Sequence, residues 1–142
     1  MVKRPFRILV LAIFVVLVSL WNGLRLGETI FFWQTLGSYG AHPIYIALSA
    51  AVWLVTGLLL GWALLAGKAW GWTATLIGIV GYNVWYWFDR LVLQKPHANW
   101  PFVLAANIIF LVIILTILLS PRTRRYFKRA ADERRSQTPT IA

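Results

Sequence analysis

Four long apolar stretches constrain the fold of this chain more than any other feature. They cover residues 8–26, 44–66, 69–88 and 102–119. The hydrocarbon core of a bilayer is about 30 Å thick and needs about 20 mainly apolar residues in a helix, a length that each stretch approaches. The stretches lack the period-two alternation of a membrane strand. The sequence therefore predicts an all-α, polytopic membrane protein that folds as a four-helix transmembrane bundle.

Prolines support the limits of these stretches. Pro43 and Pro101 stand where the second and fourth helices should begin, and the first turn of a helix tolerates proline because its amides have no partner there. Pro121 follows the last apolar residues. We therefore expect a transmembrane domain over residues 1–121 and a basic cytoplasmic tail over residues 122–142 that is disordered at its end.

The positions of Lys and Arg predict the orientation. If the N-terminus is cytoplasmic, eleven of these residues face the cytoplasm and three face the other side. This is the bias that membrane proteins show, so both termini are expected to be cytoplasmic. The basic start also suits a signal peptide, but no small-residue cleavage site follows it, and we read an uncleaved first helix. Because the cations flank apolar runs instead of covering a folded face, we expect no nucleic-acid binding.

The chain offers little of the chemistry that enzymes use. It has no cysteine, which excludes thiol catalysis and thiolate metal sites. His42 and His97 both adjoin prolines in predicted outer loops, and their surroundings have no metal-ligand spacing. No acidic residue lies at mid-membrane depth to relay protons. We therefore predict that the protein is not an enzyme and has no catalytic residues, metal or cofactor.

Three asparagines fall at nearly one depth. Asn22, Asn83 and Asn107 each lie about 20–22 Å from the inner end of their predicted helix, at 1.5 Å per residue. We predict that they face one another as a polar layer. The favoured interpretation is an interhelical hydrogen-bond clamp, with about 0.6–2 kcal/mol per contact. The other is a small polar pocket for a ligand headgroup.

Four charged residues are expected one layer farther out. If the first helix continues past residue 27, Arg25 and Glu28 reach the level of Asp89 and Arg90. Ion pairs Arg25–Asp89 and Glu28–Arg90 are then predicted, and they would help to align the first and third helices. Exposed pairs of this kind contribute about 0–1 kcal/mol each.

The segment 81–90, GYNVWYWFDR, is rich in aromatic residues. Trp and Tyr favour the headgroup level of a membrane, so the segment predicts an outer aromatic belt. If the chain binds a hydrophobic ligand, Tyr82, Trp85 and Tyr86 are the aromatic residues expected to line its cavity.

Two connecting segments leave alternatives open. Residues 27–42 are amphipathic and either extend the first helix or lie on the outer leaflet. The tail segment RTRRYFKRAADERR is either a helix on an anionic inner leaflet or a stop-transfer cluster that orients the fourth helix. Gly57 and Gly61 form a GxxxG pattern, for which packing within the bundle is favoured over dimerisation.

Three motifs carry a resemblance. They are YNVWYWFDRLVL at 82–93, NWPF at 99–102 and RTRRYF at 122–127. They resemble small four-helix bacterial integral membrane proteins with a tryptophan-rich third helix and an NWPF-type start to the fourth. The resemblance implies that fold and a bacterial plasma membrane. No activity is known for that group, so no functional residue is carried over.

The function expected from these features is non-enzymatic. We expect an accessory, scaffold or assembly subunit of a larger membrane complex, with small-residue helix faces for packing. Its partners would be the lipid bilayer, other membrane-protein subunits or a second copy of the chain, and anionic lipid at the basic tail. The alternative is a binder or transporter of a lipid, quinone, pigment or other hydrophobic small molecule.

Overall fold

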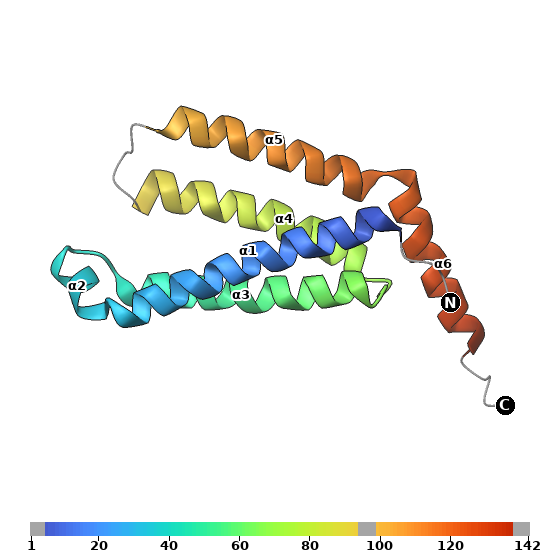
Figure 1. Cartoon of the computed structure of the whole chain (residues 1–142), viewed down its shortest axis with the longest axis horizontal. Coiled ribbons are helices and arrows are strands. Elements are labelled where there is room, and N and C mark those ends of the chain that lie inside the picture. Colours follow the sequence, from blue (N-terminus) through green and yellow to red (C-terminus); the bar gives the residue numbers. More distant parts are fainter. Residues whose placement is uncertain (1–4, 94–98, 138–142) are drawn as a thin grey trace.

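The computed structural model describes residues 5–93 and 99–137 of the chain (Figure 1). Within these residues the structure is helical and contains no strand, so the prediction of an all-α chain is confirmed. Lys3, Arg4, Lys95 and His97 lie outside the described residues, as do residues 138–142. The elements are α1 (Phe6–Phe31), α2 (Trp33–Ser38), α3 (Pro43–Leu65), α4 (Gly71–Phe88), the π-helical turn η1 (Asp89–Leu93), α5 (Trp100–Leu119) and α6 (Pro121–Gln137).

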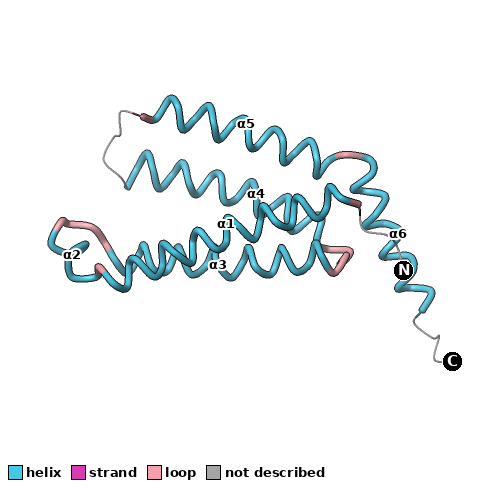
Figure 2. The backbone as a smooth tube through the Cα atoms, in the orientation of Figure 1, coloured by secondary structure: helices cyan, strands magenta, loops and turns pink. Residues whose placement is uncertain are grey.

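The long helices α1, α3, α4 and α5 run alongside one another (Figure 2), and their contacts close a ring. Each contacts two neighbours, in the order α1, α3, α4, α5 and back to α1. The α1–α3 contact is by far the most extensive, and the contacts that α5 makes with α1 and α4 are much smaller. The ring therefore consists of one tight pair and two helices held more loosely.

Three of these helices, α1, α3 and α5, are long and apolar enough to cross a membrane. Helix α4 has 18 residues but is not apolar enough to join them, because glycine, threonine, Asn83 and several Trp and Tyr residues interrupt its aliphatic positions. The coarse prediction of a membrane protein is thus supported by three helices.

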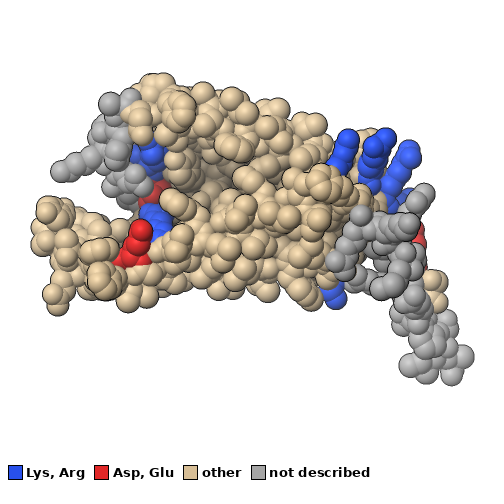
Figure 3. Space-filling model, in the orientation of Figure 1, with Lys and Arg blue, Asp and Glu red and all other residues tan. Residues whose placement is uncertain are grey.

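The outside of the ring is covered by large apolar side chains. Leu17, Val55, Ile77 and Phe110 are each more than half exposed. Figure 3 shows this uncharged surface between two groups of charged side chains, one at each end of the molecule. A water-soluble protein rarely exposes so continuous an apolar surface, and contact with hydrocarbon accounts for it.

Glycines allow the close approach of α1 and α3. A Cβ atom added to Gly57 would overlap the Ser19 Oγ atom, and one added to Gly61 would lie 2.7 Å from Val16 Cγ2. A side chain at either position would therefore force a neighbour on α1 to move. The GxxxG pattern therefore faces α1 inside the bundle.

The first part of segment 27–42 extends the first helix, while its position on the outer leaflet stays a prediction. Helix α1 continues to Phe31, and the short helix α2 follows after a single residue. Gly40, with φ of 74°, turns the chain into α3, a conformation that residues with a side chain rarely adopt.

The basic tail forms helix α6, which packs against one end of the ring. Tyr126 and Phe127 are 8% and 4% exposed, and both belong to the apolar core. The Tyr126 ring lies beside Gly67, whose φ is 58°. Helix α6 continues to Gln137, so most of the predicted tail is helical.

Candidate functional site

A cavity of about 120 Å³ lies inside the ring of long helices, all of which contribute to its wall. An apolar cavity of about 150 Å³ in another protein holds one benzene molecule. The space therefore suits one ring or a short segment of an acyl chain. The residues that line it are Phe14, Val15, Val18, Ser19, Trp53, Thr56, Gly57, Leu60, Gly78, Ile79, Tyr82, Asn83, Asn107, Phe110, Leu111 and Ile114.

Asn83 gives the cavity wall a polar group that lacks a partner. Its Nδ2 atom donates to the Ile79 carbonyl oxygen at 2.9 Å. Because a carbonyl oxygen only accepts, this bond fixes which end of the amide carries the NH2 group. The Oδ1 atom is buried, and no described residue donates to it. A buried oxygen in this state costs about 1–3 kcal/mol.

The other two asparagines of the predicted polar layer have different partners. Asn107 also lines the cavity, and its Oδ1 accepts a hydrogen bond from Trp87 Nε1 at 3.2 Å. Asn22 is 1% exposed and donates to the Val18 carbonyl at 2.8 Å. Its amide also lies within hydrogen-bonding reach of the Tyr82 hydroxyl.

The asparagine side chains therefore do not bond directly to one another in the described part of the chain. Asn22 and Asn83 each use the carbonyl four residues earlier on their own helix. That carbonyl is the nearest acceptor for a short amide side chain in a helix. The interhelical bonds at this depth run from an aromatic side chain to an amide instead of between amides.

Of the three aromatic residues predicted to face a ligand, Tyr82 lines the cavity. Its ring packs edge-on against Trp53, with centroids 5.0 Å apart, and lies 5.6 Å from Trp85. Trp85 lies beyond these rings and donates to Tyr45 Oη at 3.2 Å. Tyr86 is also outside the cavity lining, and its hydroxyl accepts a bond from Arg90 at 3.5 Å.

A polar cluster closes the end of the ring that carries α2. Arg25 Nη2 and Asp89 Oδ2 form an ion pair at 3.6 Å, which joins α1 to the start of η1. The Asp89 side chain is 5% exposed and also interacts with the Tyr45 hydroxyl of α3. The Arg25 guanidinium lies 5.6 Å above the Trp85 ring. These contacts tie three helices together around one nearly buried carboxylate.

The second predicted ion pair, between Glu28 and Arg90, is absent from the described part of the chain. Glu28 is exposed. Arg90 turns instead toward the start of α5, where it donates to Asn99 Oδ1 at 2.8 Å. The partner of Arg90 is therefore the amide of Asn99 and not the predicted carboxylate of Glu28.

Several residues of the site were not predicted from the sequence. Tyr45 was missed as a partner of Asp89, and Phe14 and Trp53 were missed as walls of the cavity. A spacing signal existed for α3, where Trp53, Gly57 and Leu60 share one helix face. Thr75 on α4 was also missed. It is fully buried, and its hydroxyl has no partner among the described residues.

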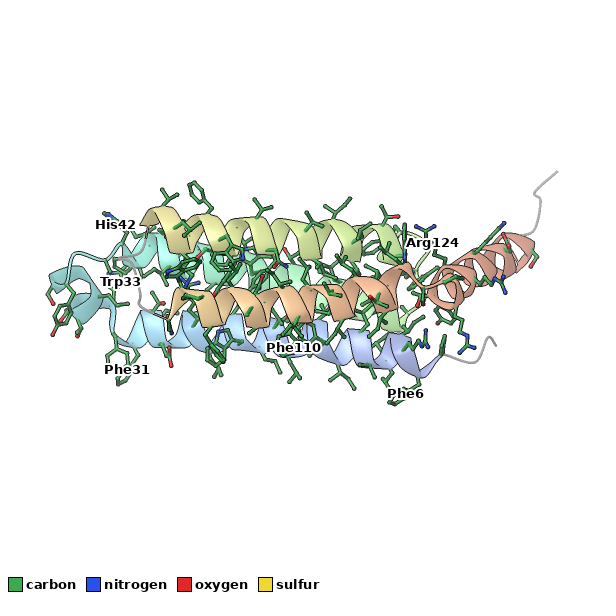
Figure 4. The ribbon with its side chains drawn as sticks, turned by 90° about the horizontal axis from the view of Figure 1, so that it is seen from above. Phe6, Phe31, Trp33, His42, Phe110 and Arg124 are labelled. Atoms are coloured by element: carbon green, nitrogen blue, oxygen red, sulfur yellow. The ribbon has the colours of Figure 1, made fainter. Side chains whose placement is uncertain are left out.

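Metal binding has no support in the described part of the chain. No group of three or more His, Cys, Asp or Glu residues there lies close enough together to hold a metal ion. His42 is exposed at the start of α3 (Figure 4).

Comparisons with protein-family models, curated proteins and solved structures found no match. The geometry of the cavity and of the two ends of the ring is therefore what bears on function.

Proposed function

We propose that the chain crosses the plasma membrane of a bacterium four times, with α4 as the third span and both termini in the cytoplasm. Helix α4 supports this proposal because it occupies a place in the ring between α3 and α5. Its 18 residues extend about 27 Å at 1.5 Å per residue, close to the thickness of a hydrocarbon core. The basic helix α6 fits the cytoplasmic side by the positive-inside rule.

Single cysteines test this orientation cleanly, because the natural chain has none. Gly37→Cys lies in α2, and Asp132→Cys lies on the exposed surface of α6. In intact cells, a membrane-impermeant maleimide is expected to label the first variant and to label the second only after permeabilisation. Labelling of both variants from outside would contradict an even number of spans, and the reverse pattern would contradict the orientation.

We infer further that the protein binds a hydrophobic small molecule within the membrane, such as a lipid, quinol or pigment. The unpaired Asn83 oxygen at the wall of an otherwise mainly apolar cavity carries this inference. A ring or a short chain segment would fill the space, while an O–H or N–H group of the ligand would supply the donor that Asn83 lacks. A hydroxyl-bearing ligand is therefore favoured over one with acceptors alone.

The energetic contribution of Asn83 follows from the cost of an unpaired oxygen. Pairing a buried acceptor recovers about 1–3 kcal/mol, which corresponds to roughly 5- to 150-fold in affinity. Asn83→Leu keeps a side chain of similar size and removes the acceptor. It is expected to lower affinity for a donor-bearing ligand by a factor in this range.

The test is purification of the full chain in mild detergent, followed by native mass spectrometry. The natural protein is expected to carry a small molecule at up to one per chain, and Asn83→Leu is expected to lose most of it. Thr73→Leu provides a matched control, because it makes a similar exchange on the exposed side of α4. Ligand-free natural protein, or equal retention by both variants, would refute the proposal.

An accessory role in a larger complex is a second candidate, and the outer end of the molecule favours it. Helix α2 contains no buried residue, and Phe31 and Tyr39 on either side of it are 81% and 85% exposed. Figure 4 shows Phe31 and Trp33 at this end of the molecule. If a partner covers them, alanine at Phe31, Trp33 and Tyr39 should abolish a stoichiometric pull-down that the natural chain supports. A monomer without partners in both cases would exclude this role.

A further inference from the structure

A second cavity lies at the opposite end of the ring, beside α6. It is shallow and wide open at the surface, with a volume of about 420 Å³, and is lined by Ala69, Trp72, Arg124, Phe127 and Lys128. This cavity is separate from the one inside the ring, because the two share no residue. Its wall combines two cations with two aromatic rings.

The position of α6 is fixed by its contacts, so the backbone that carries its cations is held in place. Phe127 and Tyr126 insert into the apolar core. Thr123 is 1% exposed, and its hydroxyl donates to the Ile117 carbonyl at 2.8 Å. These contacts anchor α6 against the end of α5. Arg124 and Lys128 are one helical turn apart, on the face that borders the cavity.

The Trp72 ring packs against one of these cations, the Arg124 guanidinium. The Arg124 Cζ atom lies 5.0 Å from the Trp72 ring centre. The indole is itself fixed, since its Nε1 donates to the Leu118 carbonyl at 2.8 Å. Stacking on a ring leaves the N–H groups at the edge of the guanidinium free to bind a planar or tetrahedral anion. Figure 4 shows Arg124 where α5 passes into α6.

Neither cation forms an ion pair with a carboxylate in the described part of the chain, and Asp132, one turn beyond Lys128, is exposed. The ion pair between Arg25 and Asp89 is the one recorded there, and it lies at the other end of the ring. The first turn of α6 contains no acidic residue. Arg124 lies at the end of the first turn of α6, where a cation opposes the helix dipole, so an external anion would relieve unfavourable charge at this residue.

We propose that this cavity binds the phosphate group of an anionic phospholipid, with Arg124 and Lys128 as phosphate ligands and Trp72 and Phe127 beside the glycerol region. Trp72, which lines the cavity, reaches the last apolar turn of α5 through its bond to the Leu118 carbonyl, and the next residue, Leu119, is 42% exposed. A lipid whose acyl chains lie along α5 would present its headgroup at this level. A soluble phosphate compound shares the same binding chemistry and is distinguished by the test.

The test compares two double variants of equal charge in the full chain. Arg124→Gln/Lys128→Gln removes both cations of the cavity. Arg122→Gln/Arg125→Gln removes two exposed cations of the same helix that do not line it. The proteins are reconstituted in discs of phosphatidylcholine with a minor fraction of phosphatidylglycerol, and bound phosphatidylglycerol is measured by native mass spectrometry after release.

The expected result is selective. The cavity variant should bind phosphatidylglycerol about 30-fold more weakly, since each cation near a membrane surface contributes about fivefold. The control variant should stay within a few fold of the natural chain. Equal losses in both variants would overturn the proposal, because general charge attraction would then suffice. Equal retention in both would overturn it as well.

Two further measurements exclude unfolding and binding of a soluble anion as explanations. Tryptophan-fluorescence melting in pure phosphatidylcholine discs should give the same midpoint for both double variants, so that unfolding does not account for a loss of lipid. Millimolar inorganic phosphate should leave phosphatidylglycerol bound. Displacement by phosphate at that concentration would overturn the lipid assignment in favour of a soluble anion.

Discussion

The close contact between α1 and α3 predicts that a larger residue at Gly57 will lower the stability of the bundle. Gly57 and Gly61 lie on the face of α3 that packs against α1. In Gly57→Ala the new methyl group would overlap the Ser19 Oγ atom and lie 3.1 Å from Ser19 Cβ. Ser19 can move only by giving up its 2.8 Å bond to the Val15 carbonyl. We therefore expect Gly57→Ala to destabilise the bundle.

The size of the effect follows from opposing terms. Overpacking an interface costs about 1–3 kcal/mol, and alanine in place of glycine favours a helix by about 0.5–1 kcal/mol. The net loss should be about 0.5–2 kcal/mol in the free energy of unfolding. Gly27→Ala is the matched control on α1, since no atom lies within 4 Å of its added Cβ. It should show the favourable term alone, so the two variants should differ in sign.

The assay is unfolding in mixed micelles with increasing sodium dodecyl sulfate, followed by the fluorescence of the nine tryptophans. Adding Ser19→Ala to Gly57→Ala removes the overlapping oxygen and should recover part of the loss, with a coupling of at least about 0.5 kcal/mol. Equal stability of Gly57→Ala and Gly27→Ala would refute the close packing. Loss of a dimer without loss of monomer stability would show that the glycines face a second copy instead.

Three other contacts give simple expectations. Arg25→Met should lower the free energy of unfolding by about 1–2 kcal/mol because Asp89 loses its cation, and exposure of the arginine limits the cost. The double variant Arg25→Met/Asp89→Asn should recover most of the lost stability in the same micelle assay. Trp72→Phe should cost about 1 kcal/mol through the lost bond to the Leu118 carbonyl, whereas Trp62→Phe on an exposed face should cost little; similar melting shifts for both would contradict this. Amide hydrogen exchange in detergent should be faster in α5 than in α1 and α3, which have the closest packing; equal protection in all three helices would contradict it.

Much of the fold could be predicted because its signals are local. Pro43 begins α3, since proline suits the first turn of a helix. The lengths of the apolar runs predicted where long helices lie, and three are long and apolar enough to cross a membrane. The docking of α6 was out of reach, because burial of Tyr126 depends on space beside Gly67 in a turn far away in the sequence.

The candidate site was harder to predict for a related reason. Depth along a helix can be counted from the sequence, and the count gave Asn83 and Asn107 similar levels. Which atoms meet depends on helix rotation and side-chain rotamers. The amide of Asn107 therefore accepts from Trp87, while the other two amides bond to their own helices. Long-range contacts of this kind leave no periodic pattern in the sequence.

The unequal closeness of the helices in the ring has a mechanical consequence. Helices α1 and α3 are locked face to face at Gly57 and Gly61, so they form a stiff wall that cannot separate without losing that fit. Helix α5 touches its neighbours at few points, yet it supplies Asn107 and Phe110 to the inner cavity. We therefore expect that a larger ligand would be admitted mainly by an outward displacement of α5, while the distance between α1 and α3 stays fixed.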